Sequence, residues 1–371
     1  MFKKNKFYLN KAIKLAKKGM NNTSPNPRVG CIIVKDNLII GKGYHRRYGE
    51  DHAEIMAIKN AKKNTKNSTI YITLEPCCHK GKTPPCTKAI IKSGIKKAII
   101  STIDPNPKVS GKGIKELKKN GVLVKYGILE KKSKKLNKGF IKRMKTGLPF
   151  VILKLALSID GKISTISGES KWITSYESRQ DVQKLRFYSD AILSTSNTIL
   201  NDNPKLNIRY KDLPKKIKKA YNKKKNPIKI IIDSNNKIHE NLNFIKDKSE
   251  VWLIRLKKDK KSFPKNVKQI IVKSKSSEKN KIDLKKLIKF LGKKKINTLL
   301  IECGSKLSGE LIKNKLIDEL IIYQAPKILG SNNISAFNIN KIKKIKQAIK
   351  LKIKNVKKIG RDIKITLKLK K

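Results

Sequence analysis

Apolar and polar positions in the first 145 residues follow helical and strand periods in turn. Apolar residues near 6–18 recur at the spacing of an amphipathic helix, and two short apolar runs follow at 29–34 and 38–40. The polar triplet Lys35-Asp36-Asn37 between these runs is a turn signal, so the runs are predicted to form a β-hairpin.

Helices and strands continue to alternate after the hairpin. One helical pattern begins near His52, and another begins at Cys86 and ends at Gly94. Strands are predicted over 69–74 and 96–102, and a further helix over 111–121. Strands separated by helices predict a layered α/β domain.

A second domain is predicted to follow the segment 145–149, because the pattern restarts there with a strongly apolar strand. We therefore expect one domain over residues 1–145 and another over 146–371. No internal repeat is visible, so the two halves are expected to be different domains. Strand candidates in the second half, with helical patterns between several of them, lie at 150–158, 190–195, 228–234, 250–256, 268–273, 296–303 and 318–326, with a β-rich tail near 349–370.

The overall composition is that of a folded protein without membrane spans. Hydrophobic residues make up 38% of the 371 residues, and no apolar stretch approaches the roughly 18 to 20 residues needed to cross a bilayer. The basic N-terminal segment has no continuous apolar core, so it is interpreted as a helix and not as a signal peptide. A cytoplasmic location is expected.

The net charge of +64 suggests a nucleic-acid partner, but the kind of basic residue argues against it. Only nine of the 91 basic residues are Arg, whereas phosphate and base recognition usually recruits Arg for its bidentate geometry. The Lys residues are spread along the whole chain, and Lys, Asn and Ile share A/T-rich codons. An A+T-rich genome therefore explains the charge better than selected nucleic-acid binding, although salt-sensitive adsorption to polyanions is expected.

A group of Cys and His residues in the first half indicates metal chemistry. Five cysteines, three of them crowded at 77, 78 and 86, favour a metal site in a reducing compartment over a disulfide framework. His52 opens a predicted helix, Cys77 follows a strand and Cys86 opens the next helix. One imidazole and two thiolates make a three-ligand zinc site whose fourth position is open to water, and zinc lowers the pKa of that water to roughly 7. Glu54 is then placed to carry a proton from the water to the ring nitrogen and leaving amine.

Less specific interpretations apply to each part of this pattern alone. An H-x-E triplet is common by chance, and a Cys pair often marks a buried core or a structural zinc with four protein ligands. Cys78 or His79 would supply the fourth ligand of such a site. The three parts together are much more specific, and they favour a catalytic zinc with Cys78 as a pocket residue. Nucleic-acid and nucleoside deaminases use P-C-x-x-C, whereas eight residues separate Cys77 from Cys86.

The string EPCCHKGKTPPC at 75–86 resembles that of the bifunctional riboflavin-biosynthesis enzymes, in which a diaminohydroxyphosphoribosylaminopyrimidine deaminase is fused to a 5-amino-6-(5-phosphoribosylamino)uracil reductase. The resemblance covers essentially the whole chain. It implies a cytidine-deaminase-like three-layer domain followed by a dihydrofolate-reductase-like α/β domain, with zinc on His52, Cys77 and Cys86 and Glu54 as the proton shuttle. Cys78 stands where the family more often has a small polar residue. Further matching strings are PNPRVG at 25–30, GYH at 43–45, DPNP at 104–107 and LNKGF at 136–140.

The second half carries weaker signals of its own. It has no G-x-G-x-x-G motif after a strand, so a Rossmann domain is not supported. Polar clusters at 158–161, 168–170, 201–204 and 302–306 follow apolar strands, where α/β folds place ligand sites, although each alone is also typical of an ordinary turn.

The resemblance adds named residues to these clusters. It implies an NADPH site formed by Ala156, Trp172, Thr198, Asp202, Ser234, Gly304, Ser305, Lys306, Leu307, Ser308, Gly309 and Glu310. It implies a substrate site formed by Lys154, Ser170, Arg186, Leu206, Arg209 and Glu302. Arg186 and Arg209 are expected to clamp a phosphate, since both are Arg in a Lys-rich chain. Lys154 and Asp202 are the first candidates for the hydride step.

The implied function is two successive steps of riboflavin biosynthesis. The first domain would deaminate 2,5-diamino-6-(5-phosphoribosylamino)pyrimidin-4(3H)-one, and the second would use NADPH to reduce the ribosyl chain of the product to ribityl. The expected partners are small phosphorylated pyrimidines, with no specific nucleic acid and no membrane, and the sequence does not reveal whether the chain forms a homo-oligomer. The rival hypotheses are a tRNA or nucleoside deaminase with an unrelated second domain, and a basic nucleic-acid-binding protein stabilised by a closed zinc site.

Overall fold

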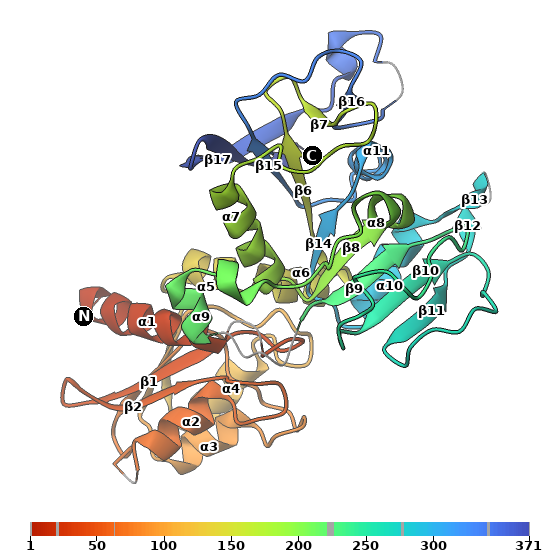
Figure 1. Ribbon diagram of the computed structural model, residues 1–371. Coiled ribbons are helices and arrows are strands. Elements are labelled where there is room, and N and C mark those ends of the chain that lie inside the picture. The colour runs from red at the N-terminus through yellow and green to blue at the C-terminus, as the bar shows by residue number, and fades with distance from the viewer. Residues whose placement is uncertain are drawn as a thin grey trace. The chain divides into compact units, whose positions relative to one another are not determined.

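The computed structural model describes residues 2–19, 22–62, 64–220, 226–275, 278–339 and 342–370. It divides into two compact units, Met1–Leu148 and Pro149–Lys371 (Figure 1). The sequence places the boundary slightly earlier, between residues 145 and 146. The helix α6 (Lys138–Thr146) runs through that point and ends at Gly147, whose positive φ of 71° closes it.

The first unit is built on a five-stranded mixed sheet of order β2-β1-β3-β4-β5. Strand β1 is antiparallel to both neighbours, and β3, β4 and β5 are parallel. The hairpin predicted around residues 35–37 joins β1 to β2. The strands are β1 (Gly30–Lys35), β2 (Leu38–Tyr44), β3 (Thr69–Ile72), β4 (Lys97–Ile100) and β5 (Leu123–Tyr126).

Helices cover both faces of this sheet, which confirms the predicted three-layer α/β domain (Figure 1). Cys31 and Ile33 of β1 pack with Ala53 and Ala57 of α2, whereas Ile32 packs with α1 on the other face. Gly30 allows α1 to approach closely, because a Cβ there would lie 2.0 Å from the Ala12 carbonyl oxygen. Besides α6, the helices of the unit are α1 (Phe2–Ala16), η1 (Lys17–Gly19), α2 (Ala53–Asn60), α3 (Cys86–Lys92), α4 (Lys112–Lys119) and α5 (Glu130–Leu136).

The second unit is built on a nine-stranded sheet of order β11-β10-β9-β8-β14-β6-β15-β18-β17. The seven strands from β11 to β15 are parallel, and β18 and β17 extend the sheet with an antiparallel hairpin. The strands are β6 (Phe150–Leu157), β8 (Ala191–Thr195), β9 (Ile228–Ile232), β10 (Val251–Arg255), β11 (Val267–Ile271), β14 (Thr298–Glu302), β15 (Glu319–Gln324), β17 (Leu351–Ile359) and β18 (Asp362–Leu369).

Helices and two small ribbons complete the second unit (Figure 1). One ribbon pairs β7 (Lys162–Ser164) with β16 (Ile334–Ser335), and the other pairs β12 (Ser274–Lys275) with β13 (Glu278–Ile282). No helix among the described residues is long and apolar enough to cross a membrane. The helices are α7 (Tyr176–Phe187), α8 (Ser196–Asp202), η2 (Tyr210–Asp212), α9 (Lys215–Ala220), α10 (Leu284–Lys293), α11 (Ser305–Lys313) and η3 (Ile345–Gln347).

The parallel strands bring their carboxyl ends to one edge of the second sheet. Lys154 of β6 lies beside Glu302 of β14 in register, and β8 and β9 end on the same side. The segments that follow these strands therefore meet there, which is where open α/β sheets place ligands.

Candidate active sites

The three predicted metal ligands converge in the first unit. His52 directly precedes α2, Cys86 is the first residue of α3, and Cys77 follows β3. The Nδ1 atom of His52 lies 3.6 Å from the Cys77 sulfur and 3.4 Å from the Cys86 sulfur. All three ligand atoms lie within 4.8 Å of one another. The fold thus brings together three residues that lie on separate segments of the chain.

These distances suit a zinc ion. Zinc–nitrogen bonds of about 2.0–2.1 Å and zinc–sulfur bonds of about 2.3 Å in a tetrahedron place the N and S atoms roughly 3.6 Å apart. The Cys86 backbone N–H points to the Cys77 sulfur at 3.4 Å, and the hydrogen bond from the Cys86 thiol lowers the pKa of Cys77. The donor set of one imidazole and two sulfurs is therefore poised to bind a soft-to-borderline divalent cation.

Glu54 is buried in the first turn of α2, next to the ligand His52 but outside the group of three ligand atoms. Burial raises the pKa of its carboxyl to about 7. Near neutral pH both the protonated and the ionised forms are accessible, as a general acid–base group requires.

His45 supports His52 without joining the ligand set. Its ring lies edge-on to the His52 ring, with centroids 5.1 Å apart. Its Nδ1 lies 3.1 Å from the Asp51 carbonyl oxygen, and its Nε2 lies 3.2 Å from the amide nitrogen of Asn26. Burial lowers the pKa of His45, so the neutral ring donates from Nδ1 and accepts at Nε2. The strings around residues 26 and 45 thus meet beside His52, a candidate zinc ligand.

Glu75 organises a loop close to the candidate metal site, and the sequence analysis missed this role. Its buried carboxylate accepts hydrogen bonds from the backbone N–H groups of Asp104, Gly111 and Ile114, at 3.0–3.1 Å. One side chain therefore fastens the 104–114 loop beside Cys77. The only sequence signal was its place in the EPCC string.

Cys78 points toward that loop. Its sulfur donates to the carbonyl oxygen of Lys108 at 3.7 Å, and it is not among the three grouped ligand atoms. His79, the other candidate for a fourth ligand, also lies outside that group. Neither residue is therefore grouped with the three candidate ligands.

The second unit contains a cavity of about 1690 Å³ at the carboxyl edge of its sheet. All six residues predicted to bind substrate line it. So do ten of the residues predicted to bind NADPH: Ala156, Trp172, Thr198, Asp202, Ser234, Gly304, Ser305, Lys306, Leu307 and Glu310.

Ser308 and Gly309 are absent from the cavity wall. The Ser308 hydroxyl is buried and donates to the carbonyl oxygens of Ser305, at 2.9 Å, and of Ala336. A Cβ at Gly309 would lie 2.1 Å from the Asn338 carbonyl oxygen. These two residues pack α11 against residues 336–338, so the expected contact stretch narrows to Gly304–Leu307 and Glu310.

Lys154, Glu302 and Arg186 form a charged cluster in the cavity. Arg186 donates from Nε and Nη2 to the two Glu302 oxygens at 2.8 and 3.1 Å, and the Lys154 nitrogen lies 3.2 Å from Glu302. Burial by itself would raise the pKa of Glu302, but the charges of Arg186 and Lys154 outweigh it and lower the pKa. The Arg186 charge is thus already balanced by a carboxylate.

Arg209 lies in a second polar cluster of the same cavity. Its Nε donates to Asp212 at 2.6 Å, and Asp212 also accepts from the Tyr176 hydroxyl at 3.3 Å. Arg179, which the sequence analysis missed, lines the cavity as well. The signal that singled out Arg186 and Arg209, an Arg kept in a Lys-rich chain, applied equally to Arg179.

Asp202 and Ser170 are joined directly, since the Ser170 hydroxyl donates to Asp202 at 2.9 Å. One residue is predicted to contact the cofactor and the other the substrate. The bond links the loop after β7 to α8 and so places both expected contacts side by side.

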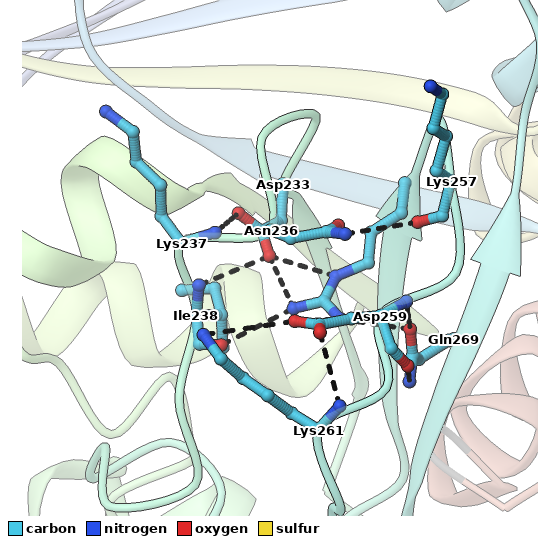
Figure 2. Close-up of polar contacts among 9 residues, drawn as sticks. Asp233, Asn236, Lys237, Ile238, Lys257, Asp259, Lys261 and Gln269 are labelled. Atoms are coloured by element: carbon cyan, nitrogen blue, oxygen red, sulfur yellow. Dashed lines mark hydrogen bonds and ion pairs between the residues drawn. The ribbon is translucent and has the colours of Figure 1, made fainter.

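A buried ion pair supports the turn that carries Ser234. Asp233 accepts from the backbone N–H groups of Lys237 and Ile238, at 2.9 and 3.3 Å (Figure 2). The same carboxylate accepts from Nε and Nη2 of Arg255 at 3.0 and 2.8 Å, and both side chains are fully buried. Gln269 and Asp259 contact the other end of Arg255, at 3.0 and 3.4 Å.

Two family models match the chain in line with its two units. Residues 2–102 match the cytidine and deoxycytidylate deaminase zinc-binding region, and residues 149–365 match the RibD C-terminal domain.

Curated relatives match nearly the whole chain. The riboflavin biosynthesis protein RibD of Buchnera aphidicola (strain Bp) is 49% identical over 365 residues, which covers 97% of each chain. RibD of Escherichia coli (strain K12) is 41% identical and covers 96% of this chain and 97% of its own.

Solved structures agree with these relatives. RibD of Acinetobacter baumannii superposes with a TM-score of 0.90 at 36% identity and full coverage of both chains. A diaminohydroxyphosphoribosylaminopyrimidine deaminase/5-amino-6-(5-phosphoribosylamino)uracil reductase from Thermotoga maritima superposes with a TM-score of 0.86 at 32% identity, covering 99% of each chain.

Proposed function

The chain belongs to the RibD family of riboflavin-biosynthesis enzymes, and from this premise we propose how its own residues divide the work. The enzyme is bifunctional. It deaminates 2,5-diamino-6-(5-phosphoribosylamino)pyrimidin-4(3H)-one and then reduces 5-amino-6-(5-phosphoribosylamino)uracil to the ribityl compound with NADPH. We assign the first reaction to residues 1–145 and the second to residues 146–371.

In the deaminase, His52, Cys77 and Cys86 would hold the zinc ion. When bound, zinc would act as a Lewis acid that lowers the pKa of water and so supplies a nucleophile at neutral pH. Glu54 would take one proton from the attacking water and pass it to the ring nitrogen. It would then carry the second proton, from the hydroxyl that the attack leaves on the ring carbon, to the leaving amine, because its raised pKa of about 7 lets it both accept and donate. His45 keeps the His52 ring in place, and Glu75 holds the 104–114 loop beside it.

In the reductase, the cavity takes both NADPH and the ribosyl substrate. Its volume of about 1690 Å³ exceeds the roughly 300–1,000 Å³ typical of a site for one small ligand. We assign the cofactor to Ala156, Trp172, Thr198, Asp202, Ser234, Gly304, Ser305, Lys306, Leu307 and Glu310. We assign the substrate to Lys154, Ser170, Arg186, Leu206, Arg209 and Glu302. The cofactor supplies the hydride, and these residues orient the two ligands.

Arg209 is the better phosphate ligand of the two arginines expected to clamp that group. A phosphate at Arg186 would face the Glu302 carboxylate, which already binds two of its guanidinium nitrogens. We therefore assign Arg186, Glu302 and Lys154 to the ribosyl hydroxyls and the ring, where a paired set of donors and acceptors is useful.

We place the enzyme in the cytoplasm. None of the five cysteines is in a disulfide, and the two assigned to zinc must stay reduced to bind it. Small phosphorylated pyrimidines are its substrates.

The convergence of His52 Nδ1 on both cysteine sulfurs carries the deaminase assignment, and zinc removal tests it. Treatment with a chelator should abolish ammonia release, and added zinc should restore it. NADPH oxidation with the aminouracil substrate supplied directly should persist, because the reductase cavity contains no part of the metal site. Ammonia release that survives complete zinc removal would contradict the assignment.

A further inference from the structure

We propose that Arg179 and Arg209 together form a subsite for a phosphate monoester in the reductase cavity. Arg179 is then a specificity-determining residue for the reduction. The inference deepens the proposed reductase function and rests on it.

Arg179 is held at the cavity wall by three contacts. Its guanidinium carbon lies 4.1 Å from the centroid of the Trp172 ring and 5.7 Å from that of the Tyr176 ring, and its Nη1 donates to the Thr174 carbonyl oxygen at 2.8 Å. Stacking on an aromatic face and a backbone hydrogen bond restrict a flexible side chain before any ligand arrives. The Arg179 guanidinium is therefore already positioned in part before a ligand binds.

The charge of Arg179 lacks a carboxylate of its own. Within the described part of the chain no Asp or Glu oxygen forms an ion pair with it, whereas Arg186 pairs with Glu302 and Arg255 with Asp233. Asp212, which lies close enough to act on Arg179, pairs with Arg209 at 2.6 Å. The charge of Glu177 also acts on Arg179 but forms no ion pair with it among the described residues.

The charges of Arg179 and Arg209 act on each other. Burial lowers the pKa of Arg179, and the positive charge of Arg209 lowers it further, while Asp212 and Glu177 act in the opposite direction. A phosphate between the two guanidinium groups would replace this repulsion with attraction.

Arg179 also has donors to spare. One of its five N–H groups binds Thr174, and Nε and Nη2 have no hydrogen-bond acceptor among the described residues. The planar guanidinium fits two phosphate oxygens at once, which Lys does not. Only nine of the 91 basic residues of the chain are Arg, and one of these nine lines the cavity at position 179. Arg at this position is what two-oxygen binding of a phosphate requires.

Two ligands of the proposed reaction carry this chemical group. The pyrimidine substrate has a 5′-phosphate on its ribosyl chain, and NADPH has a 2′-phosphate on its adenosine. Arg209 is assigned to the substrate, and Trp172 to the cofactor. The shared chemistry is a phosphate monoester, and kinetic measurements distinguish its source.

The kinetic test compares Arg179→Gln with Lys289→Gln, which removes one exposed charge from α10 outside the cavity. The substrates are the aminouracil phosphoribosyl compound and its dephosphorylated form, each with NADPH and with NADH. Arg179→Gln should raise the KM of the phosphorylated substrate by about 10- to 100-fold, with little change in kcat, and leave the dephosphorylated one unaffected. Arg179→Lys should restore part of the loss.

Other kinetic outcomes are equally decisive. A lost preference for NADPH over NADH, with an unchanged substrate KM, would place the cofactor 2′-phosphate in the subsite. An equal loss for phosphorylated and dephosphorylated substrates, with the NADPH preference kept, would overturn the proposal. Arg179 would then only anchor the backbone at Thr174.

A binding test separates this inference from the proposed function. Calorimetry on the full-length protein would compare ribose 5-phosphate with ribose, and adenosine 2′,5′-bisphosphate with adenosine 5′-monophosphate. Arg179→Gln should lose the advantage of the extra phosphate in one of these pairs, while Lys289→Gln keeps both. That result would uphold the subsite even if the native enzyme showed no reductase turnover. An advantage kept in both pairs would overturn it.

Discussion

Glu54 and Glu302 are both buried carboxyl groups, yet their pKa values move in opposite directions. Burial dominates at Glu54 and raises its pKa to about 7, whereas Arg186 and Lys154 outweigh burial at Glu302 and lower its pKa. Glu302 is therefore a permanent anion that holds two cations. Glu54 is free to exchange a proton, and this difference assigns their roles.

Replacing Glu54 with Gln should separate metal binding from deamination. The variant should keep its zinc, because Glu54 lies outside the group of three ligand atoms. Ammonia release should fall by about 10²- to 10⁴-fold, the usual contribution of a general acid–base group. Metal analysis and an ammonia assay measure the two effects.

Glu50→Gln, at an exposed position on the loop before His52, is the matched control and should keep both zinc and activity. Loss of zinc in Glu54→Gln would contradict the proposed role, and so would a turnover equal to that of Glu50→Gln.

Asp181 should contribute to the acid sensitivity of the reductase unit. Burial would raise its pKa, but hydrogen bonds from Lys184, Lys364 and Tyr323 lower it to about 2. A folded-state pKa below the unfolded value of about 3.8 gives stability that is present above pH 4 and is lost as the pH falls toward 2.

The size of this contribution is on the order of 2 kcal/mol at neutral pH. Asp181→Asn should therefore flatten the pH dependence of the unfolding free energy between pH 5 and pH 2. Tryptophan fluorescence follows the unfolding of the reductase unit, because both tryptophans, Trp172 and Trp252, lie in that unit. An unchanged slope would show that Asp181 titrates alike in the folded and unfolded chains.

The sequence alone indicated the candidate zinc ligands, which the structure brings together, because their spacing and flanking elements are specific. It gave no sign of what Glu75 and Arg179 do. Three backbone N–H groups reach Glu75 only when the 104–114 loop is folded, and Asp212, which acts on Arg179, forms its ion pair with Arg209. Such roles depend on three-dimensional contacts and leave no local pattern.

The elements with a clear apolar period were predicted close to their observed bounds. The strand predicted over 69–74 is β3 at Thr69–Ile72, and the helix predicted over 111–121 is α4 at Lys112–Lys119. Two elements were harder to locate for physical reasons. Strand β5 lies at a sheet edge with Leu123 largely exposed, so it shows no buried alternation. Helix α7 buries polar residues such as Asp181 and Gln183, which makes its sequence look solvated.

The turn after β9 depends on the Asp233–Arg255 ion pair (Figure 2). Asp233→Ala should destabilise the reductase unit by about 3–5 kcal/mol, because it leaves Arg255 charged, buried and without its main partner. It should also raise the KM for NADPH, since the turn carries Ser234. Urea unfolding followed by tryptophan fluorescence measures the first effect, and initial rates measure the second.

The double change Asp233→Asn with Arg255→Met is the control. It removes both charges, and the Asn oxygen can still accept from the backbone N–H groups of residues 237 and 238. It should cost less than Asp233→Ala alone. A double variant that is the less stable of the two would contradict a coupled pair.

The whole molecule carries a net charge of +64, which opposes its compact state. Salt should therefore stabilise it, since the Debye length falls from about 30 Å at 0.01 M to about 8 Å at 0.15 M ionic strength. We expect Tm to rise by a few degrees over this range, at about 2–4 °C for each kcal/mol gained. NaCl and KCl should act alike, and a Tm that stays flat or falls with salt would contradict net self-repulsion.

The division of one chain into a deaminase and a reductase is the central claim. A single time course on the purified, zinc-loaded protein tests it most directly. The diaminopyrimidine phosphoribosyl substrate and NADPH are supplied together, and ammonia and NADPH absorbance are followed. We predict ammonia release first, then NADPH oxidation that reaches one equivalent per ammonia. NADPH oxidation ahead of ammonia, or no ammonia from folded, zinc-replete protein, would contradict the account.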